Sequence, residues 1–367
     1  MDLIQNRLDS FLDERTVELT EVSPDLDVID AAARGLLSGG KRFRARFCYW
    51  GWQAVSARGD EFDLGAELDS PATPGLDGVV AVAAALEIFH AAALVHDDIM
   101  DRSDLRRGEP SLHRRFEALH RDRGWSGSAD GYGSAAALLL GDLLLGWSDG
   151  LFEQGVAGAE RAAAAAARAE FARMRTDVML GQYLDMLEEH SWRGRPEAEL
   201  LSRAHRVIVY KSAKYSVESP LALGASLASG SLAQVAALRE FGLPLGVAFQ
   251  LRDDLLGVFG DPAVTGKPAG DDLREGKRTV LVNLARQKLP GSASRLVDEL
   301  LGDPALDAEQ ILMLQTAIRD SGAVDQIERI IARNVEVATA ALAEAPIARS
   351  AREELTALAD TVTRRDS

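Results

Sequence analysis

The residues whose types and spacing could do chemistry in this chain are two pairs of adjacent aspartates, each following a long apolar stretch. The first pair, Asp97 and Asp98, is followed by Asp101 within residues 86–108, LEIFHAAALVHDDIMDRSDLRRG. At about 100° per residue, Asp97 and Asp101 share one helix face and Asp98 lies beside them. Three carboxylates at a helix C-terminus repel one another and oppose the macrodipole, so a compensating cation is expected. Mg²⁺ takes oxygen ligands and often shares them with phosphates.

The second pair, Asp253 and Asp254, repeats this arrangement, and Gln250 lies one turn before it. Taken alone, the first cluster could equally be a solvated acidic helix end. Cationic residues follow both pairs: Arg106, Arg107, Lys267, Lys277 and Arg278. Two acidic clusters with trailing cations are hard to explain as solvated surfaces, so the repetition favours metal binding.

This arrangement suits the ionisation of a diphosphate. Opposed carboxylates would hold Mg²⁺ ions that bridge the diphosphate oxygens, while Arg106, Lys211 and Lys267 would neutralise charge on the leaving group. The apolar parts of both segments would line a dry cavity for a hydrocarbon tail and shield a carbocation from water.

The elements that position these residues are predicted to be helices. The chain has 367 residues and 6% aromatic residues, is rich in alanine, and contains neither sustained strand alternation nor a fixed-period repeat. We predict an all-α fold, a single domain over residues 1–367 with about a dozen helices. An Asp-, Glu-, Gly- and Pro-rich segment at 56–78 is predicted to be a surface loop.

The net charge of −16 argues against nucleic-acid binding, because no basic field is present to neutralise phosphates. An anionic substrate would need local cations, and the first such cluster is GGKRFR at 39–44. That cluster fits an anion site or a solvated helix end. Cys48, the single cysteine, is predicted to be a small buried hydrophobe. No uncharged apolar run reaches about 18 residues, so we expect no membrane span and a cytoplasmic protein.

Together the motifs resemble those of the all-trans isoprenyl diphosphate synthases, or polyprenyl synthetases. They cover about residues 34–280 in family order: GGKRFR at 39–44, HDDIMDRSDLRRG at 96–108, GQYLD at 181–185, KSA at 211–213, FQLRDDLLG at 249–257 and two GK pairs at 266–277. The resemblance implies an isoprenoid synthase helical bundle around a central cavity, usually a homodimer, with three Mg²⁺ ions when substrate is bound. It also implies prenyl transfer, in which an allylic diphosphate ionises, isopentenyl diphosphate attacks the cation and a proton is lost.

The resemblance implies a role for each motif residue. Three aspartates would bind Mg²⁺, supported by their neighbours: Asp97, Asp101 and Asp253, with Asp98 and Asp254. Three cations would hold the allylic diphosphate: Arg106, Lys211 and Lys267. Four residues would hold isopentenyl diphosphate: Lys41, Arg44, His90 and Arg107. The others would contact the reacting end, support it, clamp the diphosphate or cap the isopentenyl diphosphate site: Ser212 and Gln250, Gln182 and Asp185, Lys277, and Arg364 with Arg365.

His90 lies two turns from Asp97 on nearly the same face, which favours a substrate contact over a core histidine; His96 and His113 are expected to be structural. Gly257 stands where the family usually has the third Asp of the second motif. Because the first Asp of that motif most often binds the metal directly, we expect activity to survive. Ala45 and Ser212 replace the common Pro and Thr, and Ser212 keeps the hydroxyl.

Small residues below the first aspartates predict a long product. Ala93 lies one turn below Asp97, and Ala92 is next to it. In the family, bulky aromatic residues here stop growth near the farnesyl level. Phe89, roughly 12 Å below Asp97 along the helix axis, could form a lower floor. We therefore expect geranylgeranyl diphosphate, with farnesyl or longer products as alternatives, from dimethylallyl, geranyl or farnesyl primers.

Two other functions remain open on the sequence alone. A class I terpene cyclase also ionises a diphosphate with an Asp-rich helix, but it usually has an Asn/Ser/Glu motif in place of Asp253-Asp254, and it needs no second diphosphate site. A non-catalytic partner subunit would be expected to lack motif residues, yet both aspartate pairs are intact.

Overall fold

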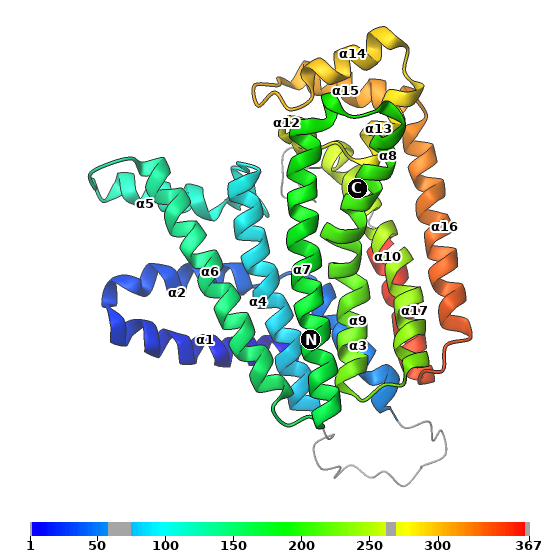
Figure 1. Cartoon of the computed structure of the whole chain (residues 1–367). Helices are drawn as coiled ribbons and strands as arrows, with labels where there is room; N and C mark the ends of the chain where they lie inside the picture. The colour runs from blue at the N-terminus through cyan, green and yellow to red at the C-terminus, as the bar shows by residue number, and fades with distance from the viewer. Residues whose placement is uncertain (1, 58–74, 262–268, 364–367) are drawn as a thin grey trace. The chain divides into compact units, whose positions relative to one another are not determined.

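The computed structural model describes residues 2–57, 75–261 and 269–363 and confirms the predicted all-α fold (Figure 1). The chain forms two compact units. Unit 1 comprises residues 1–168, 220–232 and 347–351, and unit 2 comprises residues 169–219, 233–346 and 352–367. Most of the segment expected to be a loop at 56–78, together with Lys267, Arg364 and Arg365, lies outside the described residues.

Unit 1 contains the first aspartate motif. Its elements are α1 (Asp2–Val22), the 3₁₀ helix η1 (Pro24–Leu26), α2 (Asp27–Leu37), α3 (Phe43–Ser56), α4 (Leu76–Met100), the strands β1 (Leu105–Arg106) and β2 (Glu109–Pro110), α5 (Leu112–Asp122), α6 (Ala129–Val156), the start of α7 (Arg161–Ser191) and most of α9 (Ser219–Leu227). The long helices α4 and α6 pack against each other (Figure 1).

The packing of α4 follows from its sequence, which is apolar on nearly every face. Such a helix is stable in water only when other elements cover it. α4 and α6 cross closely at a pair of glycines, because a Cβ atom on Gly78 would lie 2.7 Å from the carbonyl oxygen of Gly155. This crossing fixes the N-terminal end of α4, and Asp97 and Asp98 lie near the opposite end of the same helix.

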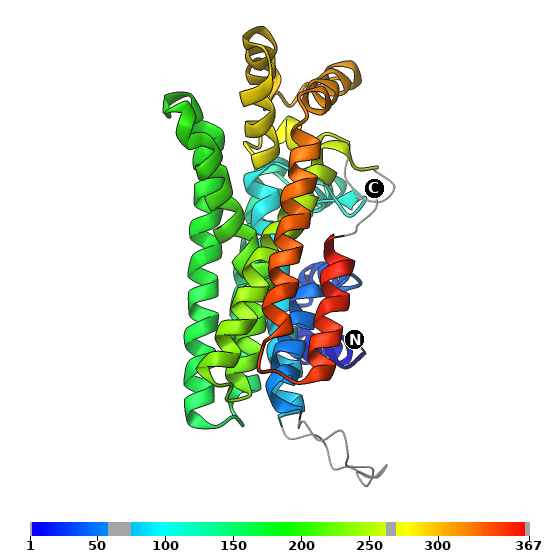
Figure 2. The same cartoon turned by 90° about the vertical axis from the view of Figure 1, so that its right-hand side faces the viewer.

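Unit 2 contains the second aspartate motif. Its elements are the rest of α7, the 3₁₀ helix η2 (Trp192–Gly194), α8 (Glu197–Val207), the π-helical segment η3 (Ile208–Glu218), α10 (Leu232–Phe259), α12 (Asp271–Glu275), α13 (Val280–Lys288), α14 (Gly291–Leu300), α15 (Ala308–Asp320), α16 (Ala323–Ala343) and α17 (Arg349–Thr363). α13 packs against α8, α15 and α16; Figure 2 shows α16 in orange and α17 in red.

Arg252 anchors α10 beside the second aspartate pair. Its guanidinium forms two hydrogen bonds, of 2.6 and 2.7 Å, with the carboxylate of Glu328 on α16. Its Nε donates to the carbonyl oxygen of Thr363 on α17 at 3.0 Å. A bidentate pair of this kind fixes direction as well as distance. The helix turn that carries Asp253 and Asp254 is therefore held by elements from the C-terminal part of the chain.

Three described helices, α4, α6 and α10, are long and apolar enough to cross a membrane by length and composition alone. In the most apolar 18-residue window, 78% of α4 is buried inside the protein, against 44% for α6 and for α10. Because most of α4 is covered by other parts of the protein, its apolar sequence is explained by packing. The expectation that no segment spans a membrane stays a prediction.

Candidate active site

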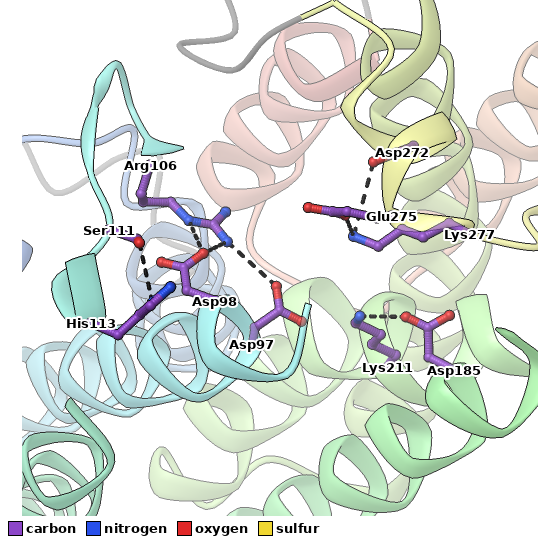
Figure 3. A network of polar contacts seen from close by, with 10 residues as sticks. All are labelled: Asp97, Asp98, Arg106, Ser111, His113, Asp185, Lys211, Asp272, Glu275 and Lys277. Atoms are coloured by element: carbon purple, nitrogen blue, oxygen red, sulfur yellow. Dashed lines mark hydrogen bonds and ion pairs between the residues drawn. The ribbon is translucent and has the colours of Figure 1, made fainter. Parts of the chain in front are cut away.

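In unit 1, Arg106 joins the first aspartates (Figure 3). Asp98 is almost completely buried, and the Nε atom of Arg106 donates to its Oδ1 at 2.9 Å; Nη2 of Arg106 makes a second contact with the same oxygen. Nη2 of Arg106 also lies 3.5 Å from Oδ2 of Asp97. Asp101, just past the end of α4, donates its backbone N–H to the carbonyl oxygen of Asp97 at 2.8 Å. The structure thus brings together the carboxylates and the cation that the sequence singled out.

A tight hairpin places Arg106 and Arg107. β1 and β2 pair Arg106 with Glu109, which leaves Arg107 and Gly108 as the two turn residues. Both have positive φ, of 55° and 81°, as a two-residue type I′ turn requires. The Nη1 atom of Arg107 donates to the carbonyl oxygen of Ser38 at 3.4 Å, and its guanidinium lies against Gly40. The GGKR segment and the RRG segment therefore meet.

Cations of these two segments gather around Glu87. Its carboxylate is buried on α4, accepts a hydrogen bond of 3.1 Å from the backbone N–H of Ala45, and lies 3.7 Å from Nη1 of Arg42. Burial raises the pKa of Glu87, and the charges of Arg44, Arg42 and Arg107 oppose that rise. The motifs did not point to Glu87, although an acidic residue inside an apolar run, three residues before His90, was a usable signal.

His90 is kept neutral in this surrounding. Burial is the main cause that lowers the pKa of His90 well below its usual value, and the positive charges of Arg44, Arg107 and Arg106 lower it further. The negative charge of Asp97 partly opposes this effect. A neutral imidazole offers one N–H donor and one acceptor without adding charge. Lys41, by contrast, is exposed on the connection between α2 and α3.

His96 and His113 have structural partners, as expected. Nε2 of His96 lies 3.4 Å from the carbonyl oxygen of Leu138 and 3.5 Å from Oδ1 of Asp142, and its ring packs on Gly141 of α6. Nδ1 of His113, a buried residue, is 3.1 Å from Oγ of Ser111.

In unit 2, the GQYLD and KSA motifs pack together. Nζ of Lys211 lies 2.5 Å from Oδ2 of Asp185, and a parallel pair joins Lys214 to Asp177 at 2.9 Å (Figure 3 shows the first pair). A Cβ atom on Gly181 would lie 2.3 Å from the backbone nitrogen of Lys211, so α7 and η3 are in backbone contact there. Because η3 is π-helical, a form that is frequent at functional sites, it departs from ordinary helix spacing where it carries Lys211 and Ser212.

The second aspartate pair is crowded with negative charge. Asp254 is buried; its Oδ1 accepts a hydrogen bond of 2.8 Å from Gln250, and its Oδ2 has no hydrogen-bond partner among the described residues. Burial raises the pKa of Asp254 to about 8; the Gln250 bond lowers it, and the charges of Asp272, Asp253 and Asp185 raise it further. Gln250, predicted to contact the reacting end, here donates to Asp254.

Lys277 lies beside this cluster at the end of α12. Its Nζ is 2.6 Å from Oε2 of Glu275 and 3.9 Å from Oδ1 of Asp272 (Figure 3). The sequence predicted a diphosphate clamp at Lys277; the structure gives the cation two carboxylate neighbours.

The aspartates of the two motifs fit Mg²⁺ by ligand type. Within residues 2–57, 75–261 and 269–363, however, no group of three or more His, Cys, Asp or Glu side chains is placed to hold a metal ion without other ligands. Mg²⁺ keeps several waters and is often bound by one or two carboxylates together with substrate phosphates, so a complete protein cage is not required. The buried oxygen of Asp254, surrounded by other carboxylates, fits a site that a divalent cation completes.

Comparison with known proteins identifies the chain. The family profile described as Polyprenyl synthetase matches residues 27–318. The chain belongs to this family. A geranylfarnesyl diphosphate synthase from Aeropyrum pernix is 30% identical over 348 residues, covering 94% of this chain and 95% of that protein. A geranylgeranyl diphosphate synthase from Mycobacterium tuberculosis is 33% identical over 312 residues, covering 84% of this chain and 76% of that protein.

A solved structure shows the same relationship. A geranylgeranyl pyrophosphate synthase from Corynebacterium glutamicum, complexed with isoprenyl diphosphate and magnesium, is 37% identical, with a TM-score of 0.89 over 100% of this chain and 98% of that chain. The resemblance drawn from the motifs is confirmed. The protein is a transferase, a prenyl diphosphate synthase.

The three residues predicted to set the product length also lie on α4. Phe89 and Ala92 are buried, whereas Ala93 is half-buried, like Asp97 on the same helix face. Of the three, Ala93 therefore has the exposure expected of a residue that lines an open space below the aspartates.

Proposed function

We propose that this prenyl diphosphate synthase condenses isopentenyl diphosphate with allylic diphosphates and releases geranylgeranyl diphosphate as its favoured product. The observation that carries the proposal is the end of α4, where Arg106 pairs with Asp98 and approaches Asp97, and where the half-buried His90 on the same helix is kept neutral. A carboxylate pair for metal ions on α4 then lies near cations from α3 and from the β1–β2 hairpin that suit a second diphosphate.

We propose Asp97, Asp101 and Asp253 as Mg²⁺ ligands, with three ions when substrate is bound. Mg²⁺ supplies charge neutralisation on the diphosphate leaving group. Asp98 acts by holding the guanidinium of Arg106 in place, and Gln250 holds Asp254. These contacts support assigning Asp98 and Asp254 to positioning the ligands beside them.

The cations of unit 1 suit the diphosphate of isopentenyl diphosphate. Arg44 and Arg107 share the buried counter-charge of Glu87, so a dianionic group that replaces water there meets fixed guanidinium donors. Neutral His90 adds a hydrogen bond without repelling these arginines. Lys41 is exposed and reaches the same anion by the flexibility of its side chain.

The allylic diphosphate is assigned to Arg106, Lys211 and Lys267, with Lys277 as a clamp. Lys211 is held by Asp185, and Gln182 lies on the same helix three residues earlier. Ser212 and Gln250 are assigned to the reacting end, where their dipoles stabilise the allylic cation. Paired and positioned cations of this kind lower the cost of charge developing on the leaving group.

Product length is assigned to the α4 face below Asp97. Small Ala93 leaves room for a growing tail, and Phe89, one turn further down, closes it. Incubation with labelled isopentenyl diphosphate and each of three primers, followed by chromatography, measures the product. A dominant C15 product would contradict the proposal. Ala93→Phe should shorten the product, and unchanged lengths would place the wall on another element.

The same assay separates the alternative functions. The purified chain alone should consume isopentenyl diphosphate in an Mg²⁺-dependent reaction. A terpene cyclase would release a hydrocarbon without isopentenyl diphosphate, and a non-catalytic subunit would be inactive until its partner is added.

We further propose that residues 1–367 form one polyprenyl synthetase domain that acts in the cytoplasm as a homodimer. The adjacent leucines Leu138 and Leu139 of α6, which are 49% and 67% exposed, support the dimer, because contiguous exposed apolar residues often mark protein–protein contacts. Light scattering of the purified protein tests it. Leu139→Glu should yield monomers, and a monomeric wild-type chain would refute the homodimer.

A further inference from the structure

Gly257 and Asp272 occupy complementary positions in unit 2. A Cβ atom built on Gly257 would lie 2.0 Å from Oδ2 of Asp272, 2.4 Å from its Cγ and 2.8 Å from its Oδ1. Real Cβ atoms essentially never approach other atoms so closely. The carboxylate of Asp272 therefore lies directly over the Cα of Gly257, in the space where a side chain at position 257 would begin.

Asp272 is held in this place by its own short helix. The backbone carbonyl of Asp272 accepts hydrogen bonds from the N–H groups of Gly276 and Lys277, both at 3.1 Å. Leu273, the next residue, is fully buried, and its carbonyl accepts a hydrogen bond of 2.9 Å from Gly302. Nζ of Lys277 lies 3.9 Å from the Asp272 carboxylate. The backbone of α12 is thus fixed at Asp272 and Leu273, which places the Asp272 side chain next to Gly257.

The carboxylate of Asp272 also belongs to the charge cluster of the second motif. Gly257 is four residues after Asp253 on α10, so the Asp272 carboxylate over Gly257 lies about one helix turn from Asp253. Oδ2 of Asp254, which is 5% exposed, has no hydrogen-bond partner among the described residues. The carboxylates of Asp253, Asp254 and Asp272 repel one another unless cations lie near them, and Lys277, 3.9 Å from Asp272, is one such cation. The arrangement therefore favours a ligand that carries positive charge.

We propose that Asp272, reaching over Gly257 from α12, supplies the third carboxylate that the second aspartate motif lacks at position 257, and that it joins Asp253 in binding Mg²⁺. Asp272 can take this place only because residue 257 is glycine, since any side chain at position 257 would displace the Asp272 carboxylate. The Mg²⁺ part of the proposal rests on the proposed function, whereas the steric part does not.

The steric part is tested in metal-free protein by thermal unfolding in EDTA. Gly257 lies inside α10, where alanine is ordinarily more favourable than glycine. Gly257→Ala should nevertheless lower Tm, because the new Cβ meets the Asp272 carboxylate. In an Asp272→Ala background the same change should raise Tm, since the three nearest atoms are gone. The same sign in both backgrounds would overturn the proposal.

The Mg²⁺ part is tested by the rise in Tm on adding Mg²⁺ and inorganic pyrophosphate, alongside turnover. Asp272→Ala should reduce both, whereas the matched control Asp271→Ala, one residue earlier, should leave both unchanged. Gly257→Asp combined with Asp272→Ala returns a carboxylate from the other side and should recover part of the Tm rise. An undiminished rise in Asp272→Ala, or no recovery in the double variant, would overturn the proposal. A wild-type chain that makes no prenyl diphosphate would refute the proposed function, while the sign reversal in EDTA would still decide the steric part.

Discussion

Gly181→Ala tests how the backbone of α7 positions the cation of η3. The added Cβ would lie 2.3 Å from the backbone nitrogen of Lys211, whereas ordinary contact begins at 3.4 Å. The two backbones must therefore separate by about 1 Å, and a misplacement of that size near the chemistry can cost about 100-fold in rate. Overpacking of this kind also costs about 1–3 kcal/mol of stability. Elsewhere in a helix the same change would be favourable by about 1 kcal/mol.

Steady-state kinetics and thermal unfolding measure both effects. We expect Gly181→Ala to lower kcat/KM for the allylic substrate by about 100-fold, because Lys211 moves with its backbone. Tm should fall by a few degrees. The matched control is Gly291→Ala in α14, where no atom lies within 4 Å of the Cβ position and neither quantity should fall. Wild-type kinetics and Tm in Gly181→Ala would refute the assignment of Lys211 to a fixed position.

Four further predictions concern single residues. Asp97→Ala and Asp253→Ala should each lower turnover by several orders of magnitude, because each removes a proposed Mg²⁺ ligand; near-normal kinetics in either would contradict the assignment. Glu87→Gln should lower the Tm of substrate-free protein, since repulsion among the guanidinium groups is no longer offset, and should increase the Tm gain on adding pyrophosphate. The wild-type protein should lose stability relative to His90→Gln as pH falls below the ordinary His pKa of 6.5, because the lowered pKa of His90 means that the unfolded chain binds a proton that the folded protein does not; parallel Tm curves between about pH 7.5 and 5.5 would oppose this. Burial raises the pKa of the Cys48 thiol, so an alkylating reagent should modify it only after unfolding, and native mass spectrometry of treated protein checks this.

The aspartate pairs could be predicted because their signal is local. Asp97 and Asp98 follow a long apolar run, and the helix period alone places them on one turn at its end. The fold class followed from the same periodicity. The role of Glu87 as a counter-charge was harder to predict, because its partners Arg42 and Arg44 lie more than forty residues earlier in the chain. A single acid in an apolar helix signals that a partner exists without indicating which residue it is.

Close contacts between backbones could not be predicted at all. Gly181 and Gly246 both allow neighbouring helices to meet η3, since a Cβ atom on Gly246 would lie 2.5 Å from the carbonyl oxygen of Ala213. In the sequence each appears as a weak point inside a helical pattern, because glycine lowers helix stability. Glycine is tolerated at these positions because α7 and α10 each approach η3 more closely than any side chain permits. These two backbone contacts hold Lys211 and Ser212 in position. Each glycine lowers the stability of its own helix but allows that helix to pack directly on η3.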